Sequence, residues 1–212
     1  MKTKLLGLII AGMMLAAAPV HAAFLQLTPA TGTADTLPGD FNPAGFPGGL
    51  VTPGVTGITV YSNGDTGGLE LVGGNATLNV EYSGSEAAFM NTFAFAPIAY
   101  SNGGTAVGTT LPVDATAGIL PFSFVTNGNG GGVAFNGGPI NPGLSIAFAA
   151  LSDGSFLALF NDGGGGDFDY DDLTVRISVS QVPLPAAAWL LISAILGLVT
   201  CARIRRSGAQ TA

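Results

Sequence analysis

Glycine interrupts the middle of this 212-residue chain too often for long helices to form there. Of its 33 glycines, two lie in residues 1–22 and two in residues 183–212, which leaves 29 in the 160 residues of 23–182, called the body below. Since globular proteins contain about 7% glycine, the body holds more than twice the usual share. Its apolar residues come in short runs between turn residues, and no run keeps a helical period for three turns. This pattern predicts an all-β body.

Alternation of apolar and polar residues marks the clearest predicted strands. Leu173, Val175 and Ile177 alternate with polar residues, which predicts one buried and one solvent-facing side. The Asp153-Gly154 step predicts a hairpin between two apolar runs. About eight strands are expected from nine candidate stretches, residues 24–28, 58–61, 69–72, 76–82, 89–95, 119–125, 144–151, 156–160 and 173–179. They predict a β-sandwich with jelly-roll-like connectivity, in which residues 29–53, 101–117 and 127–142 are long loops or unordered excursions.

Charge and residue usage exclude several function classes. All 13 acidic residues lie in the body, whose only basic residue is Arg176, so its formal net charge is 1 − 13 = −12. This charge argues against nucleic acid as a partner, because it repels phosphate. His21 and Cys201 lie outside the body, which also has no lysine. A Ser–His–Asp triad, a cysteine nucleophile, a lysine Schiff base, a His or Cys zinc site and a disulfide are therefore excluded within it.

Residues 1–22 have the pattern of a secretory signal peptide. Lys2 and Lys4 precede an apolar stretch in residues 5–18, and Val20-His21-Ala22 suits cleavage by signal peptidase after Ala22. The alternative is an uncleaved anchor or a core helix.

Residues 183–212 have the pattern of a short transmembrane helix with a basic tail. The 17 residues 186–202 carry no charge and would extend about 26 Å as a helix, enough for a thin bilayer. The positive-inside rule predicts that the tail stays in the cytoplasm and that the body is outside. The tail arginines are Arg203, Arg205 and Arg206.

This end of the chain resembles the PEP-CTERM sorting signal of Gram-negative bacteria, in its VPLPA variant. The motif is Val182, Pro183, Leu184, Pro185 and Ala186, with leucine where the name-giving motif has glutamate. The resemblance implies recognition by an exosortase-type transpeptidase, which would remove the helix and tail and pass the body to the cell surface or the extracellular matrix. Contact with the membrane would then be transient. An ordinary uncut membrane anchor is the alternative.

Residues 161–172, called the acidic segment below, concentrate negative charge in the body. The carboxylate charges of this segment repel one another, and solvent and salt, Arg176 or a bound cation must offset that repulsion. Asp167, Asp169 and Asp171 alternate, so an extended chain would point them to one side, and Ca²⁺ prefers such oxygen ligands. The expected metal ligands are Asp162, Asp167, Asp169, Asp171 and Asp172. The alternative is a solvated loop that keeps the sheet edge soluble.

Two stretches of the body resemble exported bacterial surface proteins. Residues 163–177, GGGGDFDYDDLTVRI, are similar to an Asp-rich segment that leads into a final strand. Residues 80–93, VEYSGSEAAFMNTF, are similar to a stretch of PEP-CTERM bodies. These resemblances imply a β-rich surface domain with Ca²⁺ bound by aspartates 167, 169, 171 and 172.

We therefore expect a non-enzymatic surface or matrix protein, stabilised by Ca²⁺ and contributing to an exopolysaccharide or biofilm matrix. A Ca²⁺-dependent carbohydrate-binding or adhesive module is the first alternative. A hydrolase is the second, since two carboxylates suffice for glycoside hydrolysis, although the body has no tryptophan as a sugar platform. Arg176 is expected to be a local counter-ion for aspartate rather than a catalytic group.

Overall fold

The structure is a computed structural model that describes residues 22–28, 31–36, 57–163, 170–180 and 194–195. The chain divides into two compact units, residues 1–179 and 180–212. The expected signal peptide and sorting signal lie outside the described residues, apart from Ala22 and the helical residues Ala194 and Ile195. Within the described ranges, no helix is long and apolar enough to cross a membrane.

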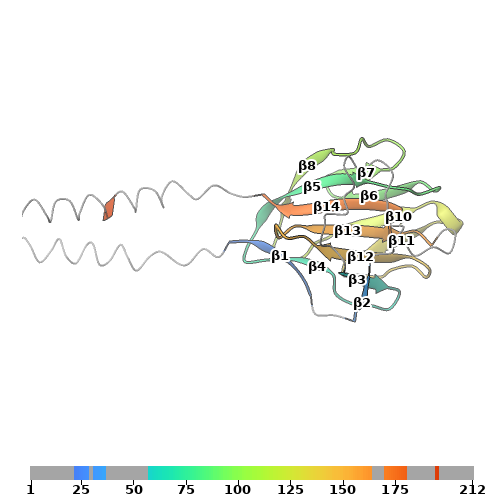
Figure 1. The fold of residues 1–212 in the computed structure, drawn as a ribbon, viewed down its shortest axis with the longest axis horizontal. Helices are drawn as coiled ribbons and strands as arrows, with labels where there is room; N and C mark the ends of the chain where they lie inside the picture. Colours follow the sequence, from blue (N-terminus) through green and yellow to red (C-terminus); the bar gives the residue numbers. More distant parts are fainter. Residues whose placement is uncertain (1–21, 29–30, 37–56, 164–169, 181–193, 196–212) are drawn as a thin grey trace, which may run out of the picture. The chain divides into compact units, whose positions relative to one another are not determined.

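The first unit is built from antiparallel β-strands (Figure 1). They form a seven-stranded sheet in the order β2-β3-β12-β13-β14-β5-β8, a four-stranded sheet in the order β11-β10-β6-β7 and a three-stranded sheet in the order β1-β4-β9. A short 3₁₀ helix, η1, spans Gly128–Gly130. The strands are β1 (Phe24–Leu27), β2 (Thr33–Thr36), β3 (Gly57–Ser62), β4 (Leu69–Val72), β5 (Ala76–Gly84), β6 (Asn91–Phe95), β7 (Ile98–Ser101), β8 (Thr110–Ala115), β9 (Gly118–Ile119), β10 (Ser123–Thr126), β11 (Gly132–Phe135), β12 (Ser145–Ala150), β13 (Phe156–Asn161) and β14 (Leu173–Val179).

The all-β prediction is confirmed, but the expected number of about eight strands is wrong. The described residues contain fourteen, and the single strand predicted at 119–125 is divided between β9 and β10. Of the missed strands, β2, β8 and β11 lie inside stretches expected to be loops, and β7 ends where one begins. These strands contain few alternating large apolar residues, so their sequences carry little period-two signal. The jelly-roll-like connectivity stays a prediction.

Aromatic rings fill the space between the layers of the sandwich. The ring centroid of Phe93 in β6 lies 5.3 Å from those of both Phe122 and Phe124. Phe124 in β10 also stacks on Phe160 in β13, at 5.0 Å. Since β10 and β13 belong to different sheets, this contact joins the two layers of the core. The core residues and strand pairs that the structure describes in this unit lie within residues 22–180.

The seven-stranded sheet is buried on both faces around β12 and β13. Leu173, Val175 and Ile177 face the main core as predicted, but Thr174 on the opposite side of β14 is also fully buried. The second face carries its own apolar cluster of Ile58, Val60, Ala147, Ala149, Leu157, Leu159 and Tyr170. The expected solvent-facing side of this strand is therefore wrong at its N-terminal end.

Both ends of the body emerge at one end of the sandwich. Phe24 pairs with Val72 and Val179 pairs with Leu78, so both flank the turn between β4 and β5. Figure 1 shows the start of β1 and the end of β14 at this end, which we call the proximal pole. The opposite end, which we call the distal pole, holds the ends of β5 and β13 and the starts of β6 and β14.

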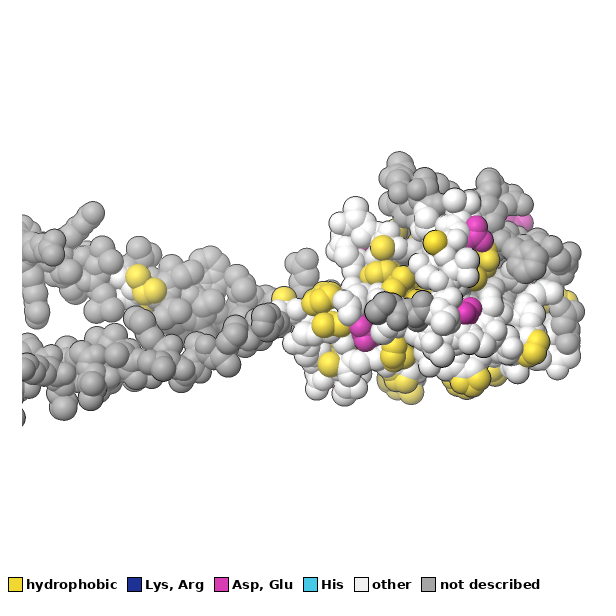
Figure 2. All heavy atoms as spheres, turned by 90° about the horizontal axis from the view of Figure 1, so that it is seen from below, with side chains coloured by type: hydrophobic (Ala, Val, Ile, Leu, Met, Phe, Trp, Pro, Cys, Tyr) yellow, Lys and Arg dark blue, Asp and Glu magenta, His cyan; other side chains and the backbone are white. Residues whose placement is uncertain are grey.

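The surface is sparsely charged. Between Glu86 and Asp153, the only charged residue is Asp114, so all of the four-stranded sheet is uncharged. Figure 2 shows single acidic side chains separated by uncharged and apolar surface. The negative charge of the body is thus unevenly distributed.

Candidate functional site

Two distant sequence stretches meet at the distal pole. The Nδ2 group of Asn91, at the start of β6, donates to Oδ2 of Asp162 at 2.8 Å and to the backbone oxygen of Asp172 at 3.3 Å. The backbone N–H of Glu86 donates to the backbone oxygen of Asp171 at 2.9 Å. The loop between β5 and β6 is therefore fastened to the acidic segment near both of its ends. The sequence presents these stretches as two separate resemblances, and the fold brings them together.

The structure describes three of the five predicted metal ligands. Asp162 and Asp171 are 1% and 2% exposed, and Asp172 is half-buried. Oδ2 of Asp172 accepts the backbone N–H of Asp162 at 2.7 Å. Asp167 and Asp169 lie outside the described residues, so the expectation that they point to the same side as Asp171 stays a prediction. An ionised carboxylate tolerates burial only with hydrogen-bonding partners, and the amide of Asn91 is one of them for Asp162.

The side chains at Asp162 present oxygen atoms, the ligand type that hard cations prefer. Among the residues that the structure covers, no three acidic, histidine or cysteine side chains form a group that could hold a metal ion. Asn91, however, is fully buried, and its Oδ1 has no hydrogen-bond partner among the described residues. This oxygen belongs to the amide that contacts Asp162, and Ca²⁺ binds carboxylate and amide oxygens together. The unpartnered oxygen is thus chemically compatible with Ca²⁺ at this position.

Tight packing fixes both sides of the acidic segment. Gly163 has a φ of +72°, and a Cβ atom there would lie 2.5 Å from the backbone oxygen of Gly143, so only glycine fits. Tyr170 has a φ of 62°, a left-handed conformation that is rare for a bulky residue. Its ring is buried in the second apolar cluster, which offsets the backbone strain. Burial raises the pKa of the Tyr170 hydroxyl, and the nearby charge of Asp35 raises it further.

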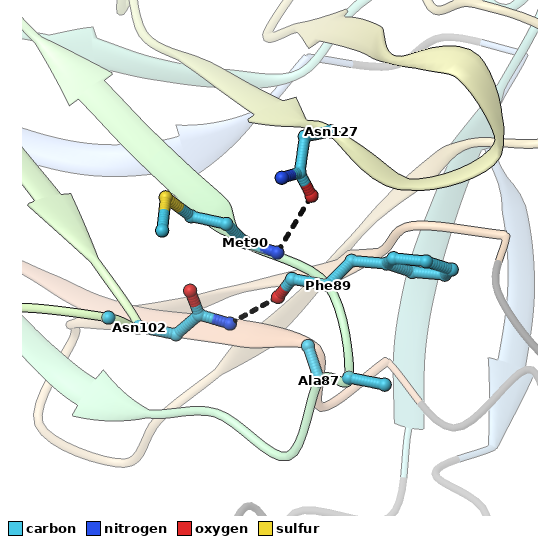
Figure 3. Close-up of a pocket in the computed structure, with 7 residues that line it drawn as sticks. Ala87, Phe89, Met90, Asn102 and Asn127 are labelled. Atoms are coloured by element: carbon cyan, nitrogen blue, oxygen red, sulfur yellow. Dashed lines mark hydrogen bonds between the residues drawn. The ribbon is translucent and has the colours of Figure 1, made fainter.

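A shallow depression of about 470 Å³ lies on the loop that contacts the acidic segment (Figure 3). Two asparagines hold the loop backbone: Asn102 Nδ2 donates to the Phe89 oxygen at 2.6 Å, and Asn127 Oδ1 accepts the Met90 N–H at 2.9 Å. The depression is lined by Ala87, Ala88, Phe89, Met90, Asn102, Gly103 and Asn127. Sequence reasoning missed this site, because the Asn-Gly steps at 102–103 and 127–128 signal only turns.

Arg176 contacts a carboxylate that lies outside the acidic segment. It forms an ion pair with Asp153, and its Nε donates to Oγ of Ser155 at 3.0 Å. The prediction that Arg176 is a local counter-ion is confirmed, with a partner in the β12–β13 hairpin. Hydrogen bonds from the Ser155 hydroxyl and backbone lower the pKa of Asp153, and Arg176 lowers it further. These contacts stabilise the fold above the ordinary pKa of aspartate, and the stabilisation is lost as the pH falls through the lowered value.

The sorting motif at 182–186 and the tail arginines lie outside the described residues. Comparisons of the chain with protein families, characterised proteins and solved structures find no match.

Proposed function

We propose that this chain is an exported protein of the bacterial cell surface or extracellular matrix and that its body acts without catalysis. In this proposal, residues 1–22 direct export, and residues 183–212 are a VPLPA-type PEP-CTERM signal that an exosortase-type transpeptidase removes. The body then contributes to the exopolysaccharide or biofilm matrix. Its residue usage supports a role without catalysis, because the common nucleophiles and bases His, Cys and Lys do not occur in it.

The observation that carries this proposal is the position of the first and last described strands of the body. Phe24 and Val179 flank the same turn at the proximal pole. A body held through either end would therefore present its distal pole, with the acidic segment and the depression, away from the attachment point. Such an arrangement suits a domain that is first tethered to a membrane and then displayed outside the cell.

The sorting step is tested by the mass of the mature protein in the producing cell. We expect the surface form to begin near Ala23 and to lack residues 187–212. Replacing Pro183 and Pro185 with alanine should keep the tail attached, because the extended segment before the helix is lost. Replacing the exposed Pro112 of β8 is the matched control and should leave processing unchanged. An intact tail on the surface form of the unmodified chain would overturn the proposal.

The second candidate is a Ca²⁺-dependent carbohydrate-binding or adhesive module. The observation that favours it is the contact of the depression-bearing loop with Asp162 through Asn91. In this version Ca²⁺ would be held by the aspartates of the acidic segment together with Oδ1 of Asn91. The hydrolase alternative has no comparable support, because none of the described residues that line the depression is acidic.

A further inference from the structure

We infer that the depression at the distal pole binds a short stretch of an uncharged polysaccharide. This inference rests on the second candidate function and gives it a site and a ligand class. It requires neither the sorting signal nor its removal, so the two proposals fail independently.

Charge selects an uncharged ligand. Among the residues that the structure describes, no ionisable side chain lines the depression. Arg176, the only basic residue of the body, is engaged by Asp153. A sulfated, phosphorylated or uronic-acid polymer would therefore meet a body of net charge −12 without a cation to receive it. A cationic ligand would find no carboxylate among the described lining residues.

The lining offers both apolar surface and a hydrogen-bond donor, which match the C–H groups and the hydroxyl groups of a sugar. Met90 is 56% exposed and Phe89 is half-buried, so both offer apolar surface to the C–H groups of a pyranose. The exposed Asn127 uses Oδ1 for the Met90 N–H, which leaves its NH₂ group able to donate to a hydroxyl. The volume lies within the usual range for ligand sites, and the open shape admits a polymer better than an enclosed metabolite.

The depression is held in shape before any ligand binds. In Figure 3, Asn102 and Asn127 approach the Phe89–Met90 backbone from opposite sides. The glycine after each asparagine leaves room for a side chain of the loop. A Cβ atom on Gly128 would lie 2.4 Å from the Phe89 ring, and one on Gly103 would lie 3.3 Å from Cε of Met90. A preformed site of this kind loses little conformational entropy on binding.

The acidic segment positions this loop. The Glu86 N–H binds the backbone oxygen of Asp171, and the Asn91 side chain binds Asp162, so residues 87–90 lie between two attachments to that segment. A cation bound at Asp162 should therefore tighten sugar binding without contacting the sugar. Asn91 is a positioning residue in this scheme.

The test is calorimetric titration of the whole chain with hexasaccharides of the cello, xylo, manno and galacto series, and with hexagalacturonate as the charged probe. We expect at least one neutral series to bind and hexagalacturonate not to bind. Replacing Met90 and Asn127 together with alanine should weaken binding by about tenfold or more, because a hydrogen bond and an apolar contact are lost.

The matched control replaces Leu111 and Asn75 with alanine. Leu111 is 40% exposed on β8, and Asn75 is an exposed residue at the proximal pole whose Oδ1 likewise accepts a backbone N–H. This variant should bind like the unmodified body. The site is overturned if no neutral series binds, if the charged probe binds as well, or if both variants lose affinity equally. Equal affinity in Ca²⁺ and in EDTA would overturn the positioning role of the acidic segment.

Discussion

Among single residues, Asn136 has the clearest structural role. Its buried side chain follows β11 and acts as a short piece of β-ladder: Oδ1 accepts the Leu69 N–H, and Nδ2 donates to the oxygens of Leu69 and Leu120, all at 2.8 Å. It thereby connects the three-stranded sheet to the four-stranded sheet. A Cβ atom on Gly68 would lie 2.1 Å from Oδ1 of Asn136, so this connection also requires glycine there.

Replacing Asn136 with alanine should lower the free energy of unfolding by about 3 kcal/mol, because buried backbone groups are left unpaired. Urea unfolding of residues 22–180 measures this change. Asn75→Ala is the control, since Asn75 is exposed and accepts a single backbone N–H, and it should cost less than about 1 kcal/mol. Similar losses of unfolding free energy in the two variants would contradict the expectation that the three buried hydrogen bonds of Asn136 stabilise the fold more than the single hydrogen bond of Asn75 does.

The role of Asn136 was not predictable from the sequence, because its partner Leu69 lies 67 positions away. The Asn136-Gly137 step indicates only a turn. The local role of Arg176, by contrast, followed from the scarcity of basic residues in the body, and only the identity of its aspartate needed the structure.

At the scale of elements, we expect the acidic segment to be the part through which bound Ca²⁺ stabilises the body against thermal unfolding. Thermal unfolding of residues 22–180 in EDTA and then in millimolar Ca²⁺ tests this. At a Ca²⁺ concentration about 100 times Kd, one site in the folded state adds about 2.7 kcal/mol. For a domain of this size we expect a rise in Tm of about 5–10 °C.

Two variants test whether the Ca²⁺-dependent rise in Tm arises in the acidic segment. Asp162→Asn keeps an oxygen that can accept the Asn91 hydrogen bond but removes the charge, so the Ca²⁺-dependent rise should be lost. Asp153→Asn changes a carboxylate of the β12–β13 hairpin and should retain the rise. An equal rise with Mg²⁺, or a full rise in Asp162→Asn, would favour the solvated acidic loop instead.

The strands that were predicted differ from those that were missed in how regularly apolar and polar residues alternate in their sequences. β5 and β14 carry large apolar residues at every second position, and both were predicted nearly to their bounds. β8 and β11 instead contain short runs with Pro112 or Gly132, and their strand conformation depends on pairing with β5 and β10. The acidic segment was predicted as a candidate metal site, but its contact with the loop between β5 and β6 was not, because no local pattern indicates that Asn91 lies beside Asp162.

For the whole molecule, the fold should be independent of the two terminal segments. The strand pairs that the structure describes in the first unit lie between Phe24 and Val179. Residues 22–180 alone should therefore unfold in a single cooperative transition, monitored by circular dichroism during a urea titration.

Ending the chain at Asp172 instead removes β14, which lies between β13 and β5 in the seven-stranded sheet. Such a chain should not fold, because Leu173, Val175 and Ile177 leave the core. A cooperative transition in the shorter chain, or none in residues 22–180, would contradict this view of the body.

The place of β14 also determines how the protein would carry mechanical load. Its C-terminal end, Val179, lies at the proximal pole, and the strand is hydrogen-bonded along both edges, to β13 and to β5. Tension applied through this end would act along the axis of β14 and load both ladders in shear at once. The bonds would then have to break together rather than one after another. A domain with this geometry is suited to hold its position under flow while it is attached by its C-terminal end.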